Sequence, residues 1–114
     1  MPYIDVKLTK NITVSEKNEL KAQLGEAICL FPGKSENWLM CNIETGKEMW
    51  FRGDNSTDIA FVEVKIFGDV NKSASEKFTA KICDYFNEKF SIASENVYIR
   101  YEGGTDWGWN GTNF

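Results

Sequence analysis

The chain has 114 residues, a formal net charge of −4 and no histidine. This length fits a single domain over residues 1–114, with room for a hydrophobic core. The scattered charges of both signs exclude nucleic acid and anionic membranes as main partners, and no apolar stretch is long enough to span a membrane.

The second residue of the chain is a candidate catalytic group. A small residue after Met1 normally allows the initiator methionine to be removed, which would leave Pro2 with a free secondary amine. An α-amine has a reference pKa of about 7.7–8.0, and apolar surroundings lower that pKa because they disfavour the ammonium form. Pro2 is therefore a candidate general base near neutral pH. The alternative is that Pro2 has no function, as in many unrelated proteins.

The first half of the chain is expected to form a strand, a helix and a second strand. Apolar and polar side chains alternate over residues 2–8, which predicts a strand. Apolar side chains at helical spacing predict a helix over residues 15–31, capped either by Thr13 in a capping box or by Ser15. Alternation over residues 38–44 predicts the next strand.

The second half repeats this order. Residues 60–67 alternate strongly and predict a strand, and Ser73 with Glu76 forms a capping box that opens a second helix. That helix carries an apolar stripe as far as Phe90, and residues 96–102 again alternate as a strand.

The two halves superpose with one offset, because from Ser15 to Ser73 is 58 positions and the same step matches apolar positions in the strands as well. This repeat predicts an α/β fold of two βαβ units, with a four-stranded mixed sheet and two helices on one face. The other face would then expose large apolar side chains, which favours burial against other subunits. These side chains are Tyr3, Met40, Phe61, Phe67 and Tyr98.

The cysteines give no sign of a metal or redox centre. Cys29, Cys41 and Cys83 lack metal-ligand and redox-motif spacing, and each falls within an apolar segment. We therefore expect buried, reduced thiols. No set of metal ligands is visible, and no cofactor is expected.

Several segments together resemble the macrophage migration inhibitory factor family of tautomerases. They are the N-terminal Pro2, the Gly33-Lys34 pair, residues 96–101 and the tail over residues 107–114. The resemblance spans the whole chain and implies a homotrimer of three sheets around a central channel, with sites between neighbouring subunits. It also implies that the proline nitrogen moves a proton between carbon and oxygen of an α-keto acid such as phenylpyruvate. Dopachrome-like compounds are further test substrates of this family.

The resemblance implies a role for particular side chains. Pro2 matches the catalytic proline. Lys34 matches the lysine that holds the substrate carboxylate, and Phe67 takes the position whose backbone amide helps to bind that group. Tyr98 matches a tyrosine contributed by the neighbouring subunit. The residues that match the apolar walls of the pocket are Trp38, Trp109 and Phe114.

Each match also has a structural alternative. Lys34 follows a helix end, where the helix dipole favours a cation in any case. Trp38 could belong to the core or an interface, Tyr98 could be a simple interface aromatic, and Trp109 could anchor the tail. Only their occurrence together with Pro2 favours a binding site.

Three departures from the family pattern affect the expected activity. Arg100 stands where the best-known members carry an asparagine, and its cation near the pocket mouth would favour acidic substrates or block some inhibitors. Phe67 is bulkier than the usual isoleucine and narrows the pocket. Ile59 and Val62 replace the cysteines of the mammalian Cys-x-x-Cys motif, so no thiol-oxidoreductase activity is expected.

The resulting functional prediction is a keto-enol tautomerase of phenylpyruvate-like α-keto acids. One alternative is a cytokine-like binding protein that engages a receptor, with turnover incidental. Another is an inactive paralogue, which would follow if Met1 is retained and the Pro2 nitrogen stays an amide. The first ten residues lack the apolar segment of a signal peptide, so we expect a cytoplasmic protein, and any extracellular role would require unconventional export.

Overall fold

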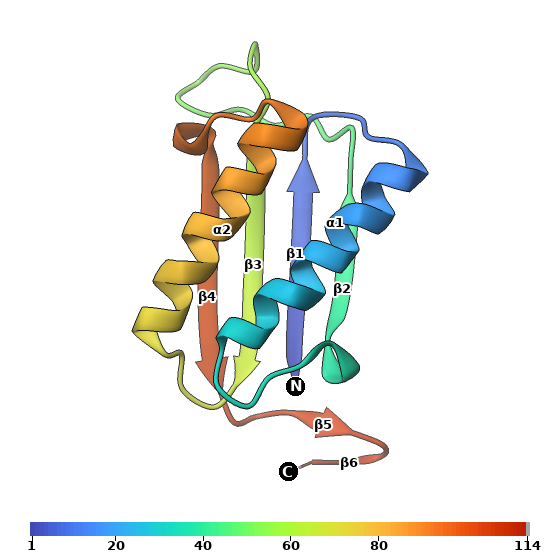
Figure 1. The fold of residues 1–114 in the computed structure, drawn as a ribbon, viewed down its shortest axis with the longest axis vertical. Coiled ribbons are helices and arrows are strands. Elements are labelled where there is room, and N and C mark those ends of the chain that lie inside the picture. Colours follow the sequence, from blue (N-terminus) through green and yellow to red (C-terminus); the bar gives the residue numbers. More distant parts are fainter. Residues whose placement is uncertain (114) are drawn as a thin grey trace.

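Two helices cover one face of a four-stranded sheet in the computed structural model, which describes residues 1–113 (Figure 1). This arrangement confirms the expected α/β fold class. In chain order the elements are β1 (Pro2–Leu8), α1 (Val14–Ala27), η1 (Ile28–Leu30), η2 (Glu36–Trp38), β2 (Met40–Glu44), β3 (Ala60–Phe67), α2 (Lys72–Phe90), η3 (Ser94–Asn96), β4 (Val97–Gly104), β5 (Gly108–Trp109) and β6 (Thr112–Asn113).

The sheet is built from two βαβ units joined side by side. Its strand order is β2-β1-β3-β4. The pairs β1–β2 and β3–β4 are parallel, as each crossover helix requires, and the central β1–β3 pair is antiparallel. The N-terminus, the ends of β3 and β4, and the small β5–β6 hairpin therefore lie at the same end of the sheet (Figure 1).

The core lies between the sheet and the helices. Alternate residues of β1 and β3 point toward the helices, and the inward residues of α1 and α2 meet them with side chains that are fully buried. Burial of each such aliphatic or aromatic side chain contributes about 1.5–3 kcal/mol. The largest of these side chains are Phe31, Phe78, Phe86, Phe90, Ile4, Leu8, Leu20 and Leu24. Within residues 1–113, no helix is long and apolar enough to cross a membrane.

The two helices are capped differently. Thr13 and Glu16 form the expected capping box, because Glu16 N–H donates to Thr13 Oγ1 at 3.1 Å and Thr13 N–H donates to Glu16 Oε1 at 2.8 Å. The capping box expected at Ser73 is wrong. Asn71 is the cap of α2, and its Oδ1 accepts from Ala74 N–H at 2.9 Å. Asparagine is at least as good a cap as serine, so the helix begins earlier and Ser73 lies in its first turn.

Other element boundaries also differ from those expected, and β4 extends to Gly104 where the sequence predicted an end at residue 102. The first helix stops short of Phe31, because this residue precedes Pro32 and is extended, with φ −83° and ψ 129°. The strand expected from Trp38 begins instead at Met40, since residues 36–38 form a 3-10 turn in which Leu39 N–H donates to Glu36 O at 3.1 Å. This turn places Trp38 at a corner beside the N-terminus.

The cysteines are free, as expected, but they are less buried than expected. Cys41 and Cys83 are partly buried, and Cys29 is exposed. Cys29 lies on the outer side of η1, where its thiol donates to Gly25 O at 3.5 Å. Its position in an apolar stretch therefore does not imply a place in the core.

The face of the sheet away from the helices carries both apolar and polar side chains. Met40 and Tyr98 are 69% and 63% exposed. Among residues 1–113, Asp5 is the only buried charged side chain, and it accepts from Asn42 Nδ2 at 2.8 Å and from the Lys7 ammonium. Burial opposes ionisation, but these donors lower the pKa of Asp5. The face is thus less uniformly apolar than the sequence suggested.

Candidate functional site

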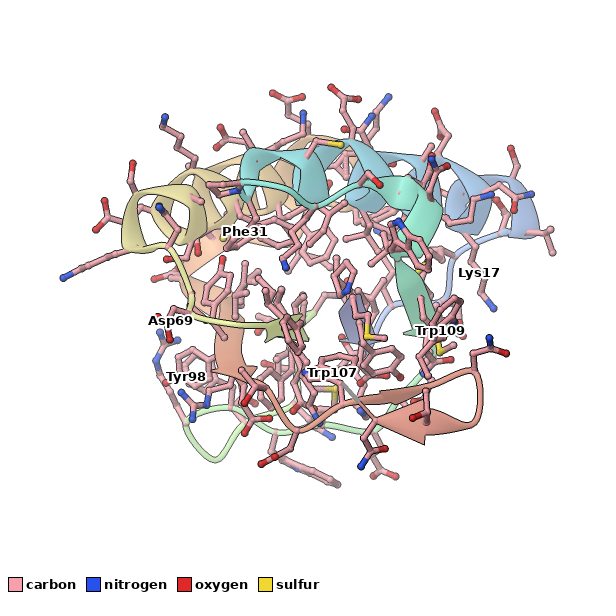
Figure 2. The ribbon with its side chains drawn as sticks, turned by 90° about the horizontal axis from the view of Figure 1, so that it is seen from below. Lys17, Phe31, Asp69, Tyr98, Trp107 and Trp109 are labelled. Atoms are coloured by element: carbon pink, nitrogen blue, oxygen red, sulfur yellow. The ribbon has the colours of Figure 1, made fainter. Side chains whose placement is uncertain are left out.

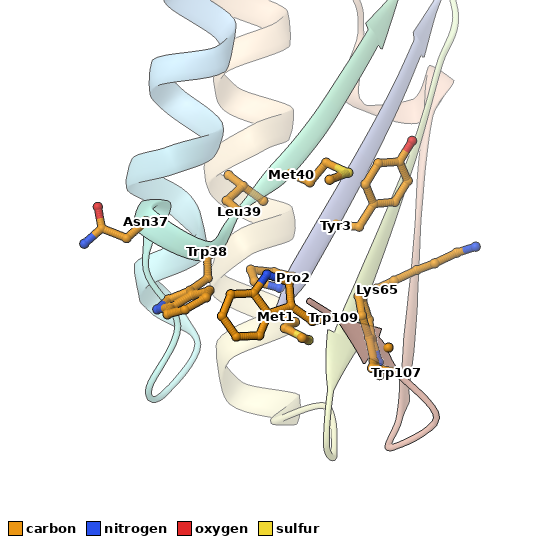
Figure 3. Close-up of a pocket in the computed structure, with 11 residues that line it drawn as sticks. Met1, Pro2, Tyr3, Asn37, Trp38, Leu39, Met40, Lys65, Trp107 and Trp109 are labelled. Carbon is orange, nitrogen blue, oxygen red and sulfur yellow. The ribbon is translucent and has the colours of Figure 1, made fainter. Parts of the chain in front are cut away.

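A cavity of about 520 Å³ opens at the start of β1, close to the N-terminus (Figure 3). Its walls come from four segments that are distant in the sequence: the start of β1, the corner between η2 and β2, the last part of β3, and the tail around β5. The lining is mostly apolar, which is typical of sites for small organic ligands. The large apolar side chains in it are Met1, Trp38, Leu39, Met40, Trp107 and Trp109.

Two tryptophans meet at the mouth of this cavity. The Trp38 and Trp109 rings lie 5.3 Å apart at 80°, in an edge-to-face arrangement. The 3-10 turn presents Trp38, and the β5–β6 hairpin presents Trp109. Asn110 and Gly111 make that hairpin turn with φ of 53° and 81°, the left-handed conformation that a two-residue hairpin loop requires. Both rings stay about half exposed, at 54% and 52%, and so remain available to a ligand.

Pro2 lies buried at the edge of the cavity, where β1 begins. It pairs with Ile66 on β3, and β2 lies on the other side of β1. The preceding Met1 is half-buried, and its carbonyl oxygen accepts a hydrogen bond of 3.1 Å from Phe67 N–H. While Met1 is present, the Pro2 nitrogen is an amide and has no basic lone pair.

Lys34 lies next to this N-terminus. Its ammonium donates to the Phe67 carbonyl oxygen at 3.0 Å and lies 5.9 Å from the centre of the Phe67 ring. Gly33, with φ of +75°, allows the turn that brings Lys34 here after the first helix. Burial, and then the Lys34 cation, lower the pKa of the Met1 amine. The structure therefore brings Lys34, Phe67 and the N-terminus together, although Lys34 does not line the cavity itself.

Tyr98 and Arg100 are not at this site within one chain. Tyr98 pairs with Phe61 on β3, whereas Pro2 pairs with Ile66 on the same strand. The separation of five residues corresponds to about 16 Å along the sheet, with two strand spacings across it. Figure 2 accordingly shows Tyr98 and Trp109 toward opposite sides of the molecule. Within one chain, neither Tyr98 nor Arg100 lines this cavity.

The structure also adds lining residues that the sequence analysis did not assign to a site. Tyr3 pairs with Met40 on one side and with Lys65 on the other, so all three reach the cavity, as does Trp107. The Lys65 ammonium is directed away from Pro2 (Figure 3). The position of Tyr3, Met40 and Lys65 around one cavity depends on strand register, which periodicity alone does not give. Phe114 lies outside the described residues, so its role stays a prediction.

The arrangement suits proton transfer by an amine. Among residues 1–113, no group of three or more His, Cys, Asp or Glu side chains could hold a metal ion. Once Met1 is removed, the secondary amine of Pro2 would face an apolar cavity beside the cation of Lys34. Both surroundings favour a neutral amine, which is the form that can accept a proton.

Comparisons with known proteins decide the family. The family model for macrophage migration inhibitory factor (MIF) matches residues 1–114. The chain belongs to the MIF family. A MIF homologue from Trichinella spiralis is 30% identical over 83 residues, which cover 71% of this chain and 72% of the relative.

Solved MIF-family structures have the same fold. Leishmania major MIF2 superposes with a TM-score of 0.89 at 25% identity, covering 100% of this chain and 97% of that one. The MIF homologue from Prochlorococcus marinus gives a TM-score of 0.78 at 27% identity, with 98% of each chain covered. The family resemblance and the MIF-like fold expected from the sequence are therefore confirmed.

Proposed function

We propose that this MIF-family protein is a keto-enol tautomerase of aromatic α-keto acids such as phenylpyruvate, with the amine of Pro2 as general base. The observation that carries the proposal is the position of Pro2, which is buried at the edge of an apolar cavity of about 520 Å³. The adjacent Lys34 supplies the charge that an anionic substrate requires. No cofactor takes part in the proposed reaction.

The reaction transfers one proton and changes no oxidation state. An α-keto acid has an acidic C–H beside its carbonyl group. The neutral Pro2 nitrogen takes this proton, and the electron pair of the C–H bond moves to form the enolate. The proline ammonium then gives the proton to the enolate oxygen, which yields the enol, and the reverse sequence yields the ketone. General-base catalysis of this kind contributes about 10²–10⁴-fold to the rate.

Substrate binding would use the charge and the apolar walls of the cavity. Lys34 would bind the substrate carboxylate through a charge-assisted contact worth about 1.5–3 kcal/mol. A carboxylate oxygen would take the place of the Met1 carbonyl as acceptor of the Phe67 N–H. The aromatic ring of the substrate would lie against the half-exposed rings of Trp38 and Trp109.

The site would be completed in a homotrimer. Tyr98 on the β4 edge and Met40 on the β2 edge are strongly exposed, so the two edges of the sheet offer different apolar surfaces. Contacts between two different surfaces form a closed ring when the rotation from one subunit to the next divides a full turn evenly. The proposed assembly is such a ring of three subunits. Tyr98 and Arg100 of one subunit would then reach the cavity of the next, where the Arg100 cation would favour acidic substrates.

The name of the Trichinella spiralis relative supports a second candidate function, which is cytokine-like binding to a receptor with incidental turnover. We propose a cytoplasmic location for the enzyme, and an extracellular role would need unconventional export. Binding by a trimer surface would survive blockage of the Pro2 amine, whereas catalysis would not.

The decisive experiment compares two N-termini. Intact mass identifies preparations without Met1, and absorbance follows the ketonisation or enolisation of phenylpyruvate. Insertion of a serine before Pro2 converts the amine to an amide after methionine removal. We expect turnover by the processed protein and none by the extended one, with equal circular dichroism. Equal rates would overturn the proline mechanism and favour the binding function.

A further inference from the structure

The ring of Tyr98 is held by a loop of its own chain. Tyr98 is 63% exposed. One side of its ring packs against Phe51, which lies in the segment between β2 and β3. The two rings lie 5.0 Å apart at 71°, edge to face. An exposed side chain without such a partner samples several rotamers, and fixing it on binding costs entropy.

Phe51 is itself held in a tight hairpin. Phe51 N–H donates to Asp54 O at 2.8 Å, and Asp54 N–H donates to Phe51 O at 3.0 Å. Arg52 and Gly53 form the two-residue turn with φ of 54° and 74°. The Asp54 carboxylate accepts from the Ser56 hydroxyl at 2.6 Å and from its N–H at 3.2 Å. The hairpin that carries Phe51 is therefore held by both backbone and side-chain hydrogen bonds.

Arg52 connects this hairpin to the segment that leads into β4. Its guanidinium carbon lies 4.3 Å from the centre of the Phe51 ring, a cation–π contact. Its nitrogens donate to Glu95 O at 3.3 Å and to Asn96 Oδ1 at 3.5 Å, just before β4 begins. Arg52 adopts the left-handed conformation, which is uncommon for a residue with a side chain and persists where neighbouring contacts hold it.

We propose that Phe51, supported by Arg52, is a positioning residue that fixes the Tyr98 side chain for the active site of the neighbouring subunit. This inference rests on the proposed function, since it assigns a role within the shared tautomerase site. Phe51 does not touch the substrate and acts through Tyr98. The competing explanation is that the two rings simply bury apolar surface around a small cavity of about 150 Å³.

The test uses variants of Phe51 with and without an aromatic ring. Phe51→Leu keeps an apolar side chain but removes the ring edge, and Phe51→Tyr keeps the ring. We expect Phe51→Leu to raise KM for phenylpyruvate about 3–10-fold, the range for loss of one aromatic pair, with kcat within about twofold. Phe51→Tyr should keep KM at the wild-type value. The control is Val14→Ala, which shortens another exposed apolar side chain at the start of α1, away from Tyr98, and should leave KM within about twofold.

A double-mutant cycle separates positioning from simple packing. In a Tyr98→Ala background, Phe51→Leu should cause no further rise in KM, because the residue through which it acts is gone. An unchanged KM in Phe51→Leu, or the same fold-rise in both backgrounds, would overturn the positioning role. Dissociation of the Phe51→Leu trimer at assay concentration, seen by light scattering, would also overturn it. Absence of turnover in the processed wild-type protein would instead refute the tautomerase proposal on which the inference rests.

Discussion

The backbone N–H of Phe67 donates a hydrogen bond of 3.1 Å to the carbonyl oxygen of Met1. Met1 thus occupies the place where the proposed function puts the substrate carboxylate, beside the ammonium of Lys34. Retention of Met1 would block the proposed reaction in two ways. The Pro2 nitrogen would remain an amide. The Met1 carbonyl oxygen would also keep accepting the Phe67 N–H, which would then not bind the substrate carboxylate.

Activity should therefore follow methionine removal. In preparations that differ in the processed fraction, measured by intact mass, we expect the rate per chain to rise in proportion to the fraction that lacks Met1. Pro2→Ala leaves a primary amine without the ring's fixed geometry, and it should lower kcat/KM by about 10²–10⁴-fold. A preparation that fully retains Met1 yet turns over phenylpyruvate would contradict this prediction.

The pH dependence should report a depressed amine pKa. Burial, and then the Lys34 cation, lower the pKa of the Met1 amine, and the same surroundings act on the Pro2 amine after processing. The neutral amine is the active form, so kcat/KM should rise with pH and level off above the apparent pKa. We expect that pKa to lie below the ordinary α-amine value of about 7.7–8.0. A rising limb at or above this value would show that the site does not depress the pKa.

Lys34→Ala should affect acids more than esters. Loss of the carboxylate contact should lower kcat/KM for phenylpyruvate by about 10–150-fold, equivalent to about 1.5–3 kcal/mol, mainly through KM. The same variant should shift the rising limb of the pH profile upward, because a cation near the amine is removed. A phenylpyruvate ester should lose much less. Lys81→Ala removes a surface cation paired with Glu26 and serves as the control. Equal losses for acid and ester would exclude carboxylate binding by Lys34.

The architecture was predictable because hydrophobic periodicity records which side of each element faces the core. The matching periodicity of the two halves led to two βαβ units and to a sheet covered by helices on one face. The boundaries were less predictable, since they depend on local competition. Asn71 and Ser73 are both acceptable caps, and only the packed helix shows that Asn71 is used.

The candidate site was predictable only in part. The resemblance pointed to Pro2, Lys34 and the tryptophans, and the structure places these near one end of β1. The Asn110-Gly111 pair is a strong hairpin signal that would have placed Trp109 more firmly. The contribution of Lys65 depends on strand register, and the proposed approach of Tyr98 to Pro2 would require a second chain. Neither follows from the pattern of one chain.

The helix caps provide a stability test that is independent of function. Asn71→Ala removes the acceptor for Ala74 N–H and should lower the free energy of unfolding by about 1 kcal/mol. Ser73→Ala should change it by less than about 0.5 kcal/mol, because the structure shows no side-chain hydrogen bond for Ser73 among residues 1–113. Urea denaturation of both variants gives the comparison. A larger loss for Ser73→Ala would mean that the helix begins at the capping box after all.

A complementation experiment tests the shared site. Light scattering should give about three times the 13.0 kDa chain mass. One chain type carries the inserted serine before Pro2 and an intact Tyr98, and the other carries an intact Pro2 and Tyr98→Ala. Each alone should be poorly active at low phenylpyruvate concentration.

Refolding the two chain types together in equal amounts should restore activity if Tyr98 acts in the neighbour's site. Random mixing makes about three quarters of the trimers mixed, and about one site in three of each mixed trimer pairs an intact Pro2 with an intact Tyr98, so about one quarter of the wild-type rate should return. Mixing the folded proteins without dissociation should restore nothing and serves as the control. No recovery in verified mixed trimers would show that Tyr98 does not complete a neighbouring site, and a stable monomer would exclude the shared site altogether.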